Sequence, residues 1–121
     1  MKNQSQINFC PEKITGKVRH LRKMIKNTTS ENQDDLLATS RKRLTDAMAR
    51  NYNPESLPST IRWLEQVREQ VNKSASDLEF VIKGTDRPLP DTVKVYGCAI
   101  NLTAELGRII RKIEKVQSER R

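Results

Sequence analysis

Aromatic residues, glycine, cysteine and histidine are all scarce in this sequence, and their scarcity argues against several classes of function. The 121 residues include one Trp, two Tyr, two Phe, four Gly, two Cys and one His. The glycines stand alone, so the chain lacks the glycine-rich loop with which many nucleotide-binding proteins hold phosphate groups. With so few aromatic side chains, we expect no stacking platform for single-stranded nucleic acid.

The cysteines and the histidine form no recognisable metal-binding or catalytic pattern. Cys10 and Cys98 lack CxxC spacing, and His20 has no neighbouring Ser, Cys or Asp constellation in the sequence. The pair Asp34-Asp35 is better explained by favourable interaction with the start of a helix than by metal binding or general-base chemistry. We therefore predict no metal site, no cofactor and no catalytic residues, and we expect the chain not to be an enzyme.

Long hydrophobic runs are also absent. No segment approaches the roughly 18 apolar residues that a membrane span requires. The N-terminal residues MKNQSQINF lack the apolar core of a signal peptide. Two lone thiols are typical of a reducing compartment. We accordingly expect a cytoplasmic protein without a membrane partner.

Two long amphipathic stripes organise the sequence. The apolar positions recur at three- and four-residue steps, with a single seven-residue step from Leu64 to Val71. They are Leu57, Ile61, Leu64, Val71, Ala75, Leu78 and Ile82, followed by Val95, Ala99, Leu102, Leu106, Ile109, Ile113 and Val116. Val67 and Val81 widen the first stripe, and Arg68 is the one residue that breaks its register. Each stripe predicts one face of a helix roughly 40 Å long. Two such helices joined by a short link pack antiparallel, because that arrangement buries both stripes.

Two shorter helices are predicted before this hairpin, at residues 11–27 and about 30–50. We expect Ser30 with Gln33 to cap the second of them, the first long helix to become regular after Pro58 or Ser59, and Gly84 to follow its end. The predicted fold is an all-α four-helix bundle, in which two shorter N-terminal helices pack on a long antiparallel hairpin. We divide the chain into a flexible N-terminal segment (1–10), one bundle domain (11–118) and a basic tail (119–121).

Positive charge is concentrated toward the two ends of the chain. The net charge is +8, with an isoelectric point near 9.8. Residues 1–50 and 91–121 carry nearly all of the excess cations, whereas the middle of the chain is close to neutral. Such a distribution favours a polyanionic partner. A solvated basic surface, with long cationic side chains lying over the core edge, would give the same composition.

The candidate nucleic-acid-binding residues are therefore the cations of the predicted first, second and fourth helices: Lys13, Lys17, Arg19, Arg22, Lys23, Lys26, Arg41, Lys42, Arg43, Arg108, Arg111, Lys112 and Lys115. A second surface is expected where the long helices extend beyond the core that the short helices can cover. We assign it to Trp63 and Phe80, and expect it to bind a protein partner or another copy of the chain.

The segment Ala104-Glu-Leu-Gly-Arg-Ile-Ile110 resembles the last helix of small, basic four-helix-bundle accessory proteins of diversity-generating retroelements. In size, charge and helicity the chain is also similar to helical small subunits of CRISPR effector complexes. Both resemblances imply a small component of a nucleoprotein complex, and neither transfers functional residues.

The sequence thus leaves two hypotheses for function. The first is a non-enzymatic subunit that contacts the backbone of DNA or RNA without sequence specificity. The alternative is a helical adaptor or regulator that docks an acidic protein partner. Convergence of the basic positions on one face would favour the first hypothesis, whereas scattered cations and an exposed apolar groove would favour the second.

Overall fold

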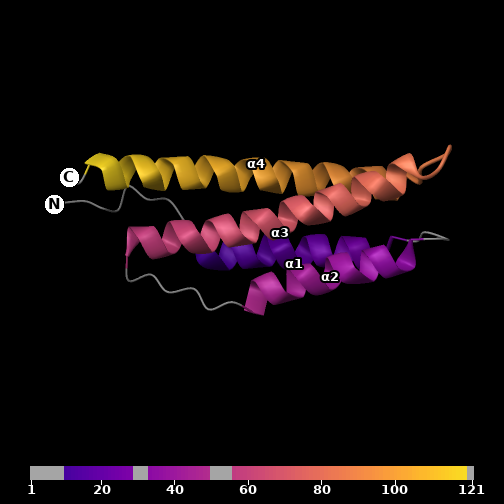
Figure 1. The fold of residues 1–121 in the computed structure, drawn as a ribbon, viewed down its shortest axis with the longest axis horizontal. Helices are drawn as coiled ribbons and strands as arrows, with labels where there is room; N and C mark the ends of the chain where they lie inside the picture. The colour runs from indigo at the N-terminus through magenta and orange to yellow at the C-terminus, as the bar shows by residue number, and fades with distance from the viewer. Residues whose placement is uncertain (1–9, 29–32, 50–55, 120–121) are drawn as a thin grey trace.

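The structure is a computed structural model that describes residues 10–28, 33–49 and 56–119, and these residues form four helices and no strand. The helices are α1 (Pro11–Lys26), α2 (Asp34–Ala49), α3 (Leu57–Lys83) and α4 (Pro90–Glu119). The predicted all-α bundle with two short and two long helices is confirmed (Figure 1). Ser30, most of the N-terminal segment and the last two residues of the predicted tail lie outside the described residues.

The four helices form a ring in which each helix packs against the next one in the chain. The most extensive contact joins α3 and α4, and the bundle closes through a smaller contact between α1 and α4. Successive helices run in opposite directions, with α1 and α2 beneath the long hairpin in Figure 1. Helix α1 therefore lies diagonally across from α3, and α2 lies diagonally across from α4.

Two helix starts differ from the sequence prediction, whereas the end of α3 agrees with it. Helix α3 begins at Leu57, before Pro58, because the Oγ of Ser56 accepts a hydrogen bond from the backbone N–H of Ser59 at 3.2 Å. Helix α2 begins at Asp34, later than predicted. Gly84 caps α3 with φ of −80°, so its backbone is right-handed and glycine is not required there for a left-handed turn.

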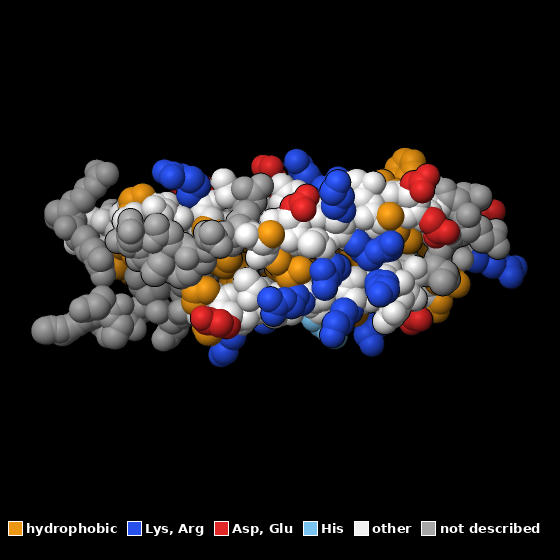
Figure 2. All heavy atoms as spheres, turned by 90° about the horizontal axis from the view of Figure 1, so that it is seen from below, with side chains coloured by type: hydrophobic (Ala, Val, Ile, Leu, Met, Phe, Trp, Pro, Cys, Tyr) orange, Lys and Arg blue, Asp and Glu red, His pale blue; other side chains and the backbone are white. Residues whose placement is uncertain are grey.

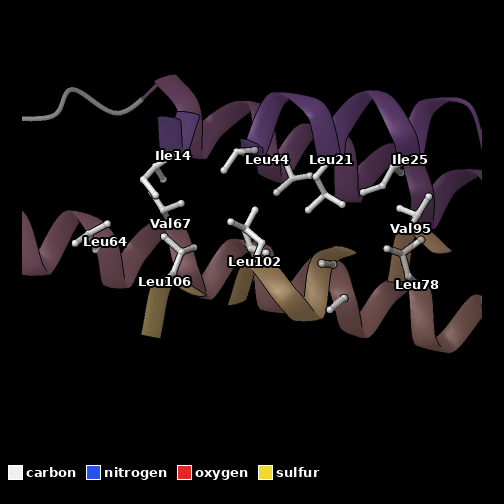
Figure 3. Close-up of a cluster of buried hydrophobic side chains, with 14 of the residues drawn as sticks. Ile14, Leu21, Ile25, Leu44, Leu64, Val67, Leu78, Val95, Leu102 and Leu106 are labelled. Atoms are coloured by element: carbon white, nitrogen blue, oxygen red, sulfur yellow. The ribbon is translucent and has the colours of Figure 1, made fainter. Parts of the chain in front are cut away.

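The core runs along the centre of the ring and receives apolar side chains from all four helices (Figure 3). Leu44, Leu64, Leu78 and Leu106 are completely buried. The predicted stripes supply most of this core, with one exchange on α4. Ile110 is 5% exposed, whereas the predicted Ile109 is only partly buried at the edge of the cluster.

Two serines are completely buried, one on α2 and one on α3. Ser40 and Ser74 are both 0% exposed, and neither hydroxyl has a hydrogen-bond partner. Each hydroxyl has therefore lost its hydration without gaining a protein partner, which costs free energy.

Arg68, which breaks the predicted apolar stripe, packs over α4. A Cβ atom added to Gly107 would lie 3.3 Å from the guanidinium carbon of Arg68. The glycine thus makes room for the arginine side chain. Among the residues that the structure describes, Gly16 and Gly97 have no such neighbour, and an added Cβ would meet none of them within 4 Å.

Candidate nucleic-acid interface

Cations from α1 and α2 meet on one face of the bundle. Arg19, Arg22 and Lys26 recur at three- and four-residue steps on α1, so they share one side of that helix. Across from them, Thr45 of α2 accepts a hydrogen bond at 3.0 Å from Nη1 of Arg22. Arg41 lies one turn from Thr45 on α2, which places it beside the same row of cations.

We call this surface the basic face, and define it by Arg19, Arg22, Lys23, Lys26, Arg41 and Lys42. Figure 2 shows Lys and Arg side chains gathered over the middle of the side formed by α1 and α2. No member of the basic face forms an ion pair with any residue that the structure describes. The acids of these helices lie toward the helix ends, at Glu12, Asp34, Asp35 and Asp46.

Two predicted binding residues are instead paired with carboxylates of neighbouring helices. Nζ of Lys17 lies 2.6 Å from Oε2 of Glu105 on α4. Nη1 of Arg43 lies 2.5 Å from Oδ2 of Asp77 on α3, and these two side chains are only 23% and 16% exposed. Both pairs link helices of the bundle, so neither cation is free for a phosphate unless its pair breaks.

The remaining predicted cations lie away from the basic face. Arg108, Arg111, Lys112 and Lys115 are exposed in the second half of α4, which is diagonal to α2. Lys13 is exposed in the first turn of α1. The structure therefore brings the cations of α1 and α2 together, and it does not add those of α4 to them.

The two predicted interface residues, Trp63 and Phe80, differ in their exposure. Trp63 is 5% exposed and belongs to the core cluster, so its side chain offers almost no surface to a partner. Phe80 is 62% exposed on α3, as an interface residue would be. Three further large apolar side chains are exposed on the segment that follows, namely Leu89, Val93 and Ile100.

Cys10 and Glu12 interact at the start of α1. The thiol of Cys10 donates a hydrogen bond at 3.0 Å to Oε2 of Glu12, and this bond lowers the pKa of the Glu12 carboxyl. The described residues contain no group of three or more His, Cys, Asp or Glu side chains that could hold a metal ion.

A surface hollow of about 1010 Å³ adjoins the basic face where α2 begins and the hairpin turns. Lys26, Arg41 and Arg87 line it together with Asp34 and Asp35. Because charges of both signs share this hollow, it favours neither an anionic nor a cationic ligand.

Neither a family model, nor a curated protein, nor a solved structure matches this chain. None of the described helices combines the length and apolarity needed to cross a membrane.

Sequence reasoning missed Thr45, which orients Arg22. A threonine on a helix has no distinctive pattern, and its partner is 23 residues away in the sequence. The ion pairs of Lys17 with Glu105 and of Arg43 with Asp77 could not be predicted from periodicity either. Periodicity shows which face of a helix a residue occupies, and not which residue lies opposite it.

Proposed function

We propose that this protein binds the phosphate backbone of nucleic acid through its basic face, without sequence specificity, as a small non-enzymatic component of a larger nucleoprotein complex. The observation that supports the proposal is the gathering of six cations from two helices on one surface, without carboxylate partners among the described residues. Like charges held this close repel one another, and a polyanion lying along them removes that repulsion.

The arrangement suits phosphate contact better than base readout. The cations project from two packed helices, so their spacing is held by the core beneath them. Thr45 further restrains Arg22 and so reduces the entropy that its side chain loses on binding a phosphate. Recognition of base edges would require a helix that enters the major groove, whereas α1 and α2 lie side by side as a broad surface.

The alternative is a helical adaptor that docks an acidic protein. The four exposed apolar side chains at one end of the long hairpin favour it, because such residues commonly mark protein contacts. Copurification distinguishes the two functions: nuclease treatment releases the partners of a nucleic-acid-binding subunit, whereas those of an adaptor remain bound.

The decisive experiment measures duplex binding over a range of salt concentrations for Arg22→Ala/Arg41→Ala. Each lost phosphate contact should lower the slope of log affinity against log salt by about 0.9 on duplex DNA, so the double variant should lose up to about two units. Arg62→Ala/Lys94→Ala removes the same charge from exposed positions on α3 and α4, and should change the slope less.

An equal loss of slope in both double variants would show that net charge, and not the basic face, determines binding. Absence of binding to DNA and RNA at low salt, with the copurified partner present as well as without it, would refute the proposal. Circular dichroism should show unchanged helix content in both variants, since all four side chains lie outside the core.

A further inference from the structure

The outward side of α4 carries an apolar stripe that none of the described helices covers. Val93, Gly97, Ile100 and Ala104 recur at steps of four, three and four, which places them along one side of the helix. Val93 is 45% exposed and Ile100 is 41% exposed, and Leu89 extends the stripe toward the hairpin turn at 48%. We call Val93, Gly97, Ile100 and Ala104 the α4 stripe.

Glycine at position 97 lowers the stability of helix α4. Glycine in a helix interior is less favourable than alanine by about 1 kcal/mol. On the same helix, the side chain of Arg68 fills the space beside Gly107, whereas a Cβ at Gly97 would meet no described residue within 4 Å. Packing against the described residues of the same copy therefore gives no reason for a glycine at position 97, whereas close approach by a second helix would.

The large and small side chains of the α4 stripe match one another when two copies of the stripe lie antiparallel. It alternates large and small residues: Val93, Gly97, Ile100, Ala104. In an antiparallel pair of α4 helices centred between residues 97 and 100, Ile100 of each copy lies against Gly97 of the other, and Val93 lies against Ala104. Large side chains then fill the spaces left by small ones. The three-four spacing suits the shallow crossing of two long helices.

At each end of this pair, two arginines come close to two aspartates, beside Arg87 of the hairpin turn. Arg108 and Arg111 follow the α4 stripe, and Asp86 and Asp91 precede it. None of the four forms an ion pair with a described residue. Antiparallel pairing brings the arginines of each copy to the hairpin end of the other, near its two aspartates, and a parallel pairing would not.

We propose that the α4 stripe is a self-association surface on which a second copy of this chain packs antiparallel through a two-fold axis between Gly97 and Ile100. The contact is isologous, so it closes as a dimer. The basic face remains free, because it involves α1 and α2 on other sides of the bundle. This proposal does not depend on nucleic-acid binding.

Sedimentation equilibrium of nucleic-acid-free protein tests the surface with a large-for-small exchange. Wild type should dimerise with rising concentration. Gly97→Leu has open space in the monomer, but would collide with Ile100 of the partner, so its dimer should dissociate more than about tenfold more readily. Gly97→Ile/Ile100→Gly exchanges the large and small positions within the stripe and should recover association. Gly16→Leu, the same kind of change at another open glycine, should leave the dimer unchanged.

A wild type that stays monomeric at millimolar concentration would overturn the proposal. It would also fail if Gly16→Leu weakened the dimer as much as Gly97→Leu, or if the exchange variant did not recover. Circular dichroism and thermal melting of each variant under monomeric conditions show whether the fold is intact. Should Gly97→Leu not fold, Ile100→Ser removes the same contact by truncation and should also yield monomers.

Discussion

Gly16 and Gly107 give a matched test of how the surroundings of a glycine decide its effect on stability. Both lie inside helices, at position 16 on α1 and position 107 on α4. Alanine is favoured over glycine in a helix interior by about 1 kcal/mol, chiefly because it loses less backbone entropy on folding. That gain is available at both positions, so any difference between them must come from what the added methyl group meets.

At Gly16 the methyl group would meet nothing within 4 Å, so Gly16→Ala should raise the free energy of unfolding by about 0.5–1 kcal/mol. At Gly107 it would lie 3.3 Å from Cζ and Nη2 of Arg68, and 3.4 Å from Nε. The guanidinium group must shift by a few tenths of an ångström, which weakens its packing on α4. We therefore expect Gly107→Ala to stabilise the protein less than Gly16→Ala.

Both changes in the free energy of unfolding can be measured by urea unfolding followed by circular dichroism, with one denaturant slope m fitted to all variants. A change of 1 kcal/mol should shift the melting temperature by roughly 2–8 °C for a chain of this size. Gly107→Ala made in the Arg68→Ala variant should raise the free energy of unfolding as much as Gly16→Ala does in the wild type, because the obstructing side chain has been removed. Equal stabilisation by Gly16→Ala and Gly107→Ala would refute the reasoning, since it would mean that the Arg68 contact contributes no free energy.

Two further predictions concern polar groups between α2 and α3. Arg43→Ala should lower the free energy of unfolding by about 1.5–3 kcal/mol, because it leaves the carboxylate of Asp77 without its partner in a partly buried site. A double-mutant cycle with Asp77→Ala measures the coupling free energy of the pair, and a value near zero would contradict the structure. Ser74→Ala should raise the free energy of unfolding by about 1 kcal/mol, because it removes a buried hydroxyl without a partner; a loss of stability in chemical denaturation would show that the hydroxyl is satisfied.

The helices could be predicted from the sequence because their stripes are long. Over the 27 residues of α3 and the 30 of α4, a wrong period would have accumulated several mismatches. The helix ends were less predictable, since a single hydrogen bond such as that from the Ser59 backbone to Ser56 decides them. Ile109 and Ile110 show the same limit within a helix, because neighbouring residues differ by only 100° in direction and both can lie near the edge of a stripe.

The candidate site was predictable only as a set of cations. Lys17 and Arg22 have the same charge and lie on the same helix, yet one pairs with Glu105 and the other faces solvent beside Thr45. Tertiary packing makes that distinction. Trp63 likewise lies beside the predicted stripe, and the position of α1 and α2 over α3 determines that it is buried and not a contact for a partner.

The ring in which each helix packs on its neighbour in the chain also has a kinetic consequence. Three of its four contacts join consecutive helices, so most of the core forms between segments close in sequence. Folds with such local contacts cross their folding barrier in microseconds to milliseconds. The contact of α1 with α4 joins the two ends of the chain and bears the greatest loop-closure entropy. We expect the α3–α4 hairpin to assemble early and the docking of α1 on α4, where Lys17 meets Glu105, to complete the native state.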